Sequence, residues 1–166
     1  MKKSYIILAV IGAAIGGFLL IIFLIYYNAY SGAVSRQETV NEKWNNVQSA
    51  YQRRADLVPQ LLATVKGAAA NEKEILLKVT QARAGIVEAK TPGDLEIMGR
   101  KIETAINLAY EAYPQIKSTE NFQEFQKQLE GTENRIKVSR NDFNGAVADY
   151  NKKARSFPIN LLANVF

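Results

Sequence analysis

Residues 5–27 read YIILAVIGAAIGGFLLIIFLIYY and contain no charged residue, and every position except Gly12, Gly16 and Gly17 is apolar. A helix of this length spans roughly 34 Å at about 1.5 Å per residue, which is enough to cross the hydrocarbon core of a bilayer with some tilt. The stretch predicts an N-terminal transmembrane helix, preceded by a short cytoplasmic tail at residues 1–4. It divides the chain into an anchor and one domain.

A cleaved signal peptide is the main alternative for this stretch. The apolar region of a signal peptide is only about 7–15 residues long and ends in a small-residue cleavage site. Here the run is longer, and Tyr26, Tyr27 and Tyr30 occupy the place of an interfacial aromatic belt. The chain has no cysteine, which excludes a bacterial lipoprotein. These features favour an uncleaved anchor.

Flanking charge predicts the orientation of the anchor, because cytoplasmic flanks carry an excess of lysine and arginine. Lys2 and Lys3 precede the apolar run, whereas the next residues after it offer only Arg36 and Lys43, which two glutamates offset. We expect the N-terminus in the cytoplasm and the domain outside, which in a cell with two membranes is the periplasm. The predicted location is the bacterial cytoplasmic (inner) membrane, crossed once.

Small residues line one side of the predicted membrane helix. Gly12 and Gly16 form a GxxxG motif, and Gly17 belongs to an adjacent stripe with Ala9 and Ala13. Such positions let two membrane helices approach closely and associate. Gly12, Gly16 and Gly17 are therefore a candidate oligomerisation site in the membrane. The alternative is that glycine and alanine are simply common in membrane helices.

The composition excludes several classes of functional site. The chain of 166 residues contains no histidine and no cysteine, so it has no zinc finger, Ser-His-Asp triad, thiolate nucleophile or disulfide framework. The paired Glu-x-x-His motifs of di-iron bundles are excluded on the same ground. We expect no metal, no cofactor and no catalytic residue, and we predict that the chain is not an enzyme.

The net charge of +5 does not predict a nucleic-acid partner. Without Lys2 and Lys3 the chain has 19 basic and 16 acidic residues, and these are well mixed along the sequence. Nucleic-acid-binding proteins instead gather their basic residues on one face or along one helix.

Beyond residue 27 the sequence predicts helices throughout, because four stretches carry apolar residues at alternating spacings of three and four. We expect helices at residues 28–57, 59–90, 93–113 and 118–155, with breaks near Pro59 and Gly67. The clearest seam lies in the last of these and comprises Phe122, Phe125, Leu129, Thr132, Ile136, Ser139, Phe143, Ala146 and Tyr150.

Four amphipathic helices joined by short links predict an all-α fold, namely an antiparallel up-down-up-down four-helix bundle over residues 28–155. No charged or Pro/Gly-rich linker separates Tyr27 from Ala33. The first bundle helix is therefore expected to continue directly from the membrane helix.

In that topology the apolar C-terminal tail, residues 156–166, returns to the bilayer. A basic cluster followed by apolar side chains is typical of a segment that lies at the lipid headgroups. The candidates for this contact are Lys152, Lys153, Arg155, Phe157, Leu161, Leu162 and Phe166. The alternative, favoured because it needs no lipid, is that the apolar side chains fold back as a cap on the open end of the bundle.

Two groups of charged residues lie where the bundle would bring helices together: Arg53, Arg54 and Asp56 near the end of the first helix, and Glu130, Glu133 and Arg135 in the fourth. An ion network between Arg53 or Arg54 and Glu130 or Glu133 would fix the register of the helices while adding little net stability. Asp56 is expected to cap a helix that restarts at Pro59. The alternative to this favoured structural reading is a patch that binds an anion or a partner protein.

Two segments carry a resemblance to a known family. The first is YQRRADLVPQL at residues 51–61, followed by TVKG at 64–67 and VTQAR at 79–83. The second runs from EAYP at 111–114 through TENRI at 132–136 to the end of the chain. With the N-terminal anchor, these blocks resemble the LemA family of bacterial membrane proteins along essentially the whole chain.

The resemblance implies a single N-terminal membrane helix, a four-helix bundle and no established catalytic activity. Some members of the family are associated with magnetosome membranes, which suggests a role in shaping membranes. The chain departs from the family pattern in having Phe143-Asn144 in place of Tyr-Asn, and Ala68–Ala70 where an aromatic residue is common. The missing hydroxyl weakens any case for a tyrosine-based site.

Two non-enzymatic functions follow as hypotheses. In the first, anchored bundles form a homo-oligomer, contact membrane lipid, and act as a scaffold that organises or shapes the membrane. In the second, the chain is an adaptor or sensor module that presents its bundle to a membrane protein partner. A type IV pilin is disfavoured because residues 5–27 contain no glutamate.

Overall fold

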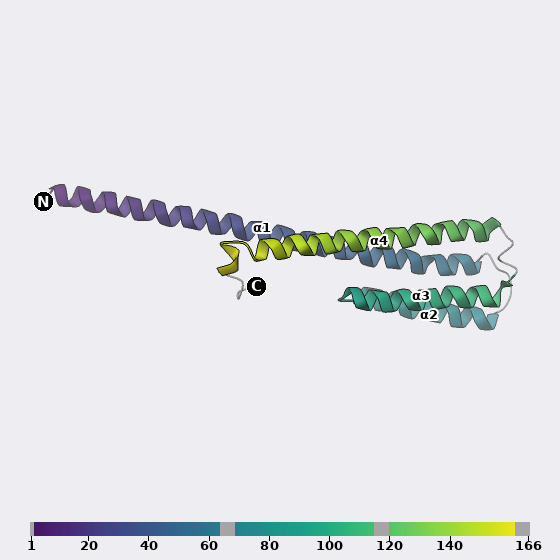
Figure 1. The fold of residues 1–166 in the computed structure, drawn as a ribbon. Coiled ribbons are helices and arrows are strands. Elements are labelled where there is room, and N and C mark those ends of the chain that lie inside the picture. Colours follow the sequence, from purple (N-terminus) through teal and green to yellow (C-terminus); the bar gives the residue numbers. More distant parts are fainter. Residues whose placement is uncertain (1, 64–68, 115–119, 162–166) are drawn as a thin grey trace. The chain divides into compact units, whose positions relative to one another are not determined.

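The computed structural model describes residues 2–63, 69–114 and 120–161, and within these ranges it contains helices and no strand (Figure 1). The elements are α1 (Lys2–Ala63), α2 (Ala69–Glu88), α3 (Pro92–Ala112), α4 (Glu120–Ala154) and the short 3-10 helix η2 (Ile159–Leu161). The predicted all-α class with four helices is confirmed. The apolar run at residues 5–27 continues as part of α1 without a break.

The chain divides into two compact units. Residues 42–143 form one unit, which we call the bundle, and residues 1–41 with 144–166 form the other, which we call the terminal unit. Both α1 and α4 contribute residues to each unit.

The bundle packs parts of all four helices around one apolar core. The seams expected from the sequence supply this core, and its largest fully buried side chains are Leu61, Ile75, Ile86, Leu95, Ile102, Val47, Val58 and Val79. Each such side chain contributes about 1.5–3 kcal/mol relative to its exposed state. On α4 four residues in the first half of the predicted seam are buried, Phe122, Phe125, Thr132 and Ile136, and Leu129 is partly buried against the same core.

Cross-helix contacts give the directions of the helices in the bundle. Trp44 on α1 packs against Phe143 on α4 with ring centroids 5.2 Å apart, and further along α1 Arg54 pairs with Glu133. The partner number on α4 falls as the number on α1 rises, so the two helices are antiparallel. On the next pair, Gly85 of α2 faces Met98 of α3 across a three-residue link.

The start of α3 explains why the chain turns sharply after α2. Thr91 is the N-cap, and its hydroxyl accepts from the backbone N–H of Asp94, 3.2 Å away. The Asp94 carboxylate in turn accepts from the backbone N–H of Thr91. These reciprocal bonds form a capping box, and they hold the pKa of Asp94 below its usual value.

The helix boundary predicted at Pro59 is wrong, because α1 passes through Pro59 and ends at Ala63. A proline inside a helix removes one backbone hydrogen bond. Here the residues on either side, Val58 and Leu61, are buried in the core, and their burial keeps the segment helical. The other predicted boundaries differ from α3 and α4 by one or two residues, and Gly67 lies outside the described residues.

The terminal unit contains the apolar stretch of α1, the last turns of α4 and η2. An 18-residue window near the N-terminus has a mean hydropathy of 2.9 and none of it is buried, which makes this helix the one candidate membrane span in the described part of the chain. Farther along α1, Ala29 and Ala33 form a small buried apolar cluster with Ile159.

Candidate functional site

The best-defined polar contact of the bundle is the ion pair between Arg54 of α1 and Glu133 of α4. Nη1 of Arg54 donates to Oε2 of Glu133 at 2.5 Å. The Arg54 side chain is only 14% exposed, whereas the Glu133 side chain is 61% exposed. The pair joins the two residue groups that the sequence expected to meet, and it places a nearly buried guanidinium under a solvated carboxylate.

Tyr51 lies one turn before Arg54 and belongs to the same polar group. Burial raises the pKa of the Tyr51 phenol, while the hydrogen bond and charge of Arg140 act in the opposite direction. The carboxylates of Glu133 and Glu96 add a further upward contribution to this pKa. The phenol therefore stays protonated at neutral pH.

A second cross-helix pair joins Asp56 of α1 to Arg83 of α2. This contact corrects the expectation that Asp56 caps a restarting helix, because α1 is continuous at that point. Both side chains are about half exposed, so their attraction is screened and contributes about 0–1 kcal/mol. Asp56 ties α1 to α2, just as Glu133 ties α4 to α1.

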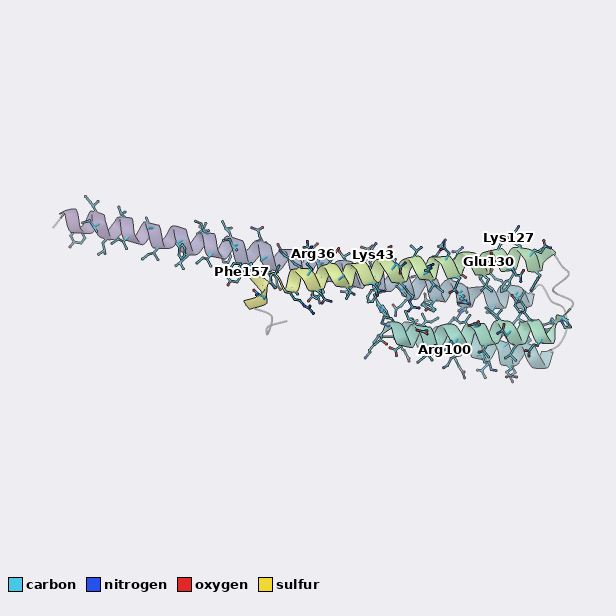
Figure 2. The ribbon with its side chains drawn as sticks, in the orientation of Figure 1. Arg36, Lys43, Arg100, Lys127, Glu130 and Phe157 are labelled. Atoms are coloured by element: carbon cyan, nitrogen blue, oxygen red, sulfur yellow. The ribbon has the colours of Figure 1, made fainter. Side chains whose placement is uncertain are left out.

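The remaining members of the predicted ion network lie on the surface. Arg53, Glu130 and Arg135 are exposed, and within the described residues the structure gives none of them an ion pair. Figure 2 shows Glu130 on α4 with its side chain directed away from the helix. These three charges are available to solvent or to a partner.

The glycines of the predicted oligomerisation site lie on the apolar part of α1. A Cβ atom added at Gly12, Gly16 or Gly17 would meet nothing within 4 Å. No other described segment of this chain fills the space beside them.

The C-terminal tail divides into a buried part and an exposed part. Pro158 and Ile159 are buried, and Ile159 packs against Ala29 and Ala33 of α1. Phe157 is 75% exposed (Figure 2). Lys152 and Arg155 are exposed and Lys153 is half-buried, while the side chain of Leu161 and the whole of Leu162 and Phe166 lie outside what the structure describes.

A shallow pocket of about 250 Å³ opens between α2 and α3. It is lined by Glu74, Ile75, Leu108, Glu111 and Ala112. Glu74 already pairs with Lys78 at 2.9 Å, and among the described residues no group of three or more carboxylates is placed to hold a metal ion. The pocket is open to solvent and lined by both polar and apolar side chains, and these lining residues include no acid–base pair placed for catalysis.

Two contacts of the bundle were not expected from the sequence. Gln48 of α1 donates its amide to the backbone carbonyls of Ile86 and Ala89, at 3.0 and 3.3 Å, and so satisfies the end of α2. Arg83 appeared only as the last residue of the VTQAR block, and its role as the partner of Asp56 depends on the register of α2 against α1. No local pattern in the sequence encodes that register.

Comparison with known proteins places these features in a family. A model of the LemA family matches residues 43–166, which is most of the chain. The chain is also similar to a protein from Metamycoplasma hominis that carries the name Protein LemA, with 24% identity over 147 residues. That alignment covers 86% of this chain and 67% of the mycoplasma protein.

Proposed function

This chain belongs to the LemA family, and we propose that it is a non-enzymatic, single-pass membrane protein whose copies assemble into a scaffold that organises or shapes the membrane. The observation that carries the proposal is the apolar stretch of α1, where a window of mean hydropathy 2.9 is 0% buried. Soluble proteins rarely expose apolar patches larger than a few hundred Å². Lipid is the environment that suits such a surface.

The proposed location is the cytoplasmic (inner) membrane of a bacterium, with the N-terminus inside and the bundle on the extracytoplasmic side. Lys2 and Lys3 precede the span and support this orientation through the positive-inside rule. The family membership is consistent with a bacterial source.

Self-assembly would use the open glycine face of the span. Gly12 and Gly16 are spaced as in helix pairs that pack closely in lipid, and no described side chain of the same molecule lies beside them. The exposed charges of the bundle, such as Arg53 and Glu130, would then add polar contacts between neighbouring copies.

The absence of a catalytic role is supported by the use of the polar residues in structural contacts. The buried guanidinium of Arg54 is occupied by Glu133, and the phenol of Tyr51 is held protonated. The chain has neither histidine nor cysteine to supply a base or a nucleophile near neutral pH.

The alternative function is a membrane-anchored adaptor or sensor that presents the bundle to a partner protein. It is supported by apolar side chains left on the bundle surface, namely Leu77, Val87, Ile97 and Val138. Single exposed apolar side chains are common in soluble domains, so the scaffold is preferred.

The size of the full-length protein in its own membrane separates the two functions. The protein is extracted with a membrane-solubilising polymer that keeps native lipid, and its mass is measured by light scattering and particle imaging. Regular particles of many copies are expected for the scaffold. Monomers or dimers that retain a second protein would overturn the scaffold and support the adaptor.

A matched pair of variants tests the glycine face. Gly12→Ile with Gly16→Ile closes that face and is expected to reduce the particle mass. Ala14→Ile adds an isoleucine side chain on the opposite side of the helix, because each residue turns the helix by about 100°. An equal effect of both variants would show that the assembly does not depend on the GxxxG face.

A further inference from the structure

We propose that the turn after α4 is a membrane-interface contact: Ile159 seats it on α1, and this seat holds Phe157 and the neighbouring cations at the headgroups of the anionic membrane that α1 crosses. The inference rests on the proposed membrane anchor. It adds a second, specific lipid contact at the C-terminal end of the described chain.

The seat is an ordered contact within the terminal unit. Ala29 and Ala33 are four residues apart and therefore share one face of α1, and Ile159 packs onto that face with a side chain only 3% exposed. Backbone bonds from Ser156 to the Lys153 carbonyl and from Asn160 to the Ser156 carbonyl connect the turn to the end of α4. Backbone hydrogen bonds thus attach the turn to the end of α4, and Ile159 attaches it to α1.

The seat lies at the level expected for lipid headgroups. The apolar run of α1 ends at Tyr27, and Ala29 follows it by about 3 Å of helix rise, with Ala33 about 9 Å beyond the run. The polar layer of a bilayer adds roughly 5–8 Å to each side of the hydrocarbon core. Ile159 is therefore held within or just above that layer.

The residues beside the seat have the chemistry of an interfacial contact. Phe157 is 75% exposed, so its ring is free to enter the boundary between headgroups and acyl chains. The neighbouring cations Lys152 and Arg155 are exposed as well. An aromatic ring beside basic side chains is the composition that binds anionic interfaces.

Two further cations, Lys153 of α4 and Arg36 of α1, lie at Gly32 of α1 next to this turn. A Cβ atom added at Gly32 would lie 3.3 Å from Cε of Lys153, so the aliphatic stem of Lys153 crosses this glycine. Nη1 of Arg36 donates to the Gly32 carbonyl at 2.9 Å. All five ion pairs among the described residues lie in the bundle, so none of these pairs includes Arg36 or Lys153. Anionic phospholipid fits this unbalanced charge.

The experiment measures how deep residue 157 lies in a membrane. A single tryptophan is placed there by Phe157→Trp in a Trp44→Phe background, and the full chain is reconstituted in vesicles with quenchers at known depths. We expect strong quenching from headgroup-level labels and weaker quenching from labels deep in the acyl chains. Val138→Trp, at an exposed apolar position of α4 in the bundle, is the matched control and is expected to remain unquenched.

A third probe separates this inference from the membrane anchor itself. Phe23→Trp lies within the apolar run and should be quenched by acyl-chain labels. If the probe at residue 23 is quenched and the probe at residue 157 behaves like the control, the anchor stands and the interfacial turn is refuted. If the probe at residue 23 is not quenched, the anchor fails as well.

The role of charge is tested with lipid composition. Vesicles of phosphatidylcholine alone are compared with vesicles that also contain phosphatidylglycerol, and the quenching at residue 157 is expected to increase with the anionic lipid. Changing Lys152, Lys153 and Arg155 to glutamine should abolish that increase, since each cation lost weakens association with anionic lipid roughly fivefold. Changing the exposed Lys101, Lys127 and Lys137 of the bundle to glutamine should leave the increase in quenching unchanged. An increase that survives the first triple variant would contradict the assignment.

Discussion

At the scale of single residues, the bundle shows an asymmetric ion pair. Arg54 is nearly buried and its Nε has no hydrogen-bond partner among the described groups, whereas Glu133 is mostly in water. Removing the carboxylate leaves a desolvated cation without compensation, but removing the guanidinium leaves only a hydrated carboxylate. The two halves of this pair are therefore not equivalent for stability.

We expect Glu133→Gln to lower the free energy of unfolding by about 1–2 kcal/mol, less than for a fully buried pair because Glu133 is exposed. Arg54→Met keeps the packing volume and should cost less than about 1 kcal/mol. The measurement is urea unfolding of the full-length protein in detergent. Glu74→Gln, which breaks the exposed pair with Lys78, is the control and should change stability by less than about 0.5 kcal/mol.

Tyr110 also has a buried polar atom without a hydrogen-bond partner, but its side chain is uncharged. Its ring packs edge-on against Phe122 with the two ring centroids 5.2 Å apart, and its buried hydroxyl has no hydrogen-bond partner among the described residues. Burial raises the pKa of the Tyr110 phenol. The folded protein therefore holds this proton at pH values where the unfolded chain has lost it.

This difference predicts a stability loss at high pH. Below the unfolded pKa of about 10 the phenol is neutral in both states, and above it the unfolded state gains ionisation that the folded state lacks, until the raised folded pKa is reached. Tyr110→Phe should reduce the loss of unfolding free energy between pH 9 and 11, each value being roughly one unit from that pKa. At neutral pH the variant should be neutral or up to about 1 kcal/mol more stable. Tyr51→Phe, which loses the Arg140 hydrogen bond, should instead be less stable at neutral pH.

At the scale of helices, close approach is concentrated where α3 meets its neighbours. A Cβ atom at Gly99 of α3 would lie 2.8 Å from Cε1 of Tyr51, a buried ring on α1. A Cβ atom at Gly85 of α2 would meet the side chain of Met98 on α3. Gly131 on α4 has nothing within 4 Å. The surroundings of these three helical glycines thus range from enclosed to open.

Alanine at each position should separate packing from helix propensity. Gly131→Ala is expected to raise the free energy of unfolding by about 0.5–1 kcal/mol, because glycine is unfavourable inside a helix. Gly99→Ala should lower it by about 1–3 kcal/mol through overpacking against a rigid ring. The change in unfolding free energy for Gly85→Ala should lie between these two values, since the methionine side chain can rotate away. A stabilising Gly99→Ala would contradict the close contact of α1 with α3.

Pro59 illustrates how packing overrides a local signal at this scale. A proline is expected to end or restart a helix, yet α1 extends four residues past it to Ala63. The apolar seam continues on both sides of the proline, with Val58 and Leu62 buried. The stabilisation that the flanking residues gain by burial in the core exceeds the stabilisation lost with one hydrogen bond.

At the scale of the whole molecule, the central expectation is that the bundle lies outside the cytoplasm. The natural chain has no cysteine, so a single introduced thiol reports its own location. Ser49 is exposed on α1 in the bundle and is a suitable site.

Ser49→Cys should react with a membrane-impermeant maleimide in intact spheroplasts. Ser4→Cys, on the other side of the predicted span, should react only after lysis. The reverse pattern would place the bundle in the cytoplasm and overturn the orientation drawn from Lys2 and Lys3. Labelling of both residues in intact spheroplasts would argue against a spanning helix.

The amino-acid sequence by itself determined the elements of this protein. An uncharged run of apolar residues identifies the candidate span, and spacings of three and four identify the buried faces, because both signals are local and arise from the geometry of a single helix. The seam predicted on the last helix coincides with buried Phe122, Phe125 and Ile136. The family resemblance was also readable from contiguous blocks, and the family match over residues 43–166 confirms it.

Only the tertiary structure decided which side chains meet. The sequence offered Arg53 or Arg54 with Glu130 or Glu133, and the register of α4 against α1 selected Arg54 with Glu133. The register of α2 against α1 paired Asp56 with Arg83, and the turn after α4 brought Ile159 onto Ala29 and Ala33. Ion pairs and tail contacts join residues far apart in the chain, and their partners depend on the sliding and rotation of whole helices. The packing of the whole core determines how far each helix slides and rotates, and no local spacing in the sequence encodes this arrangement.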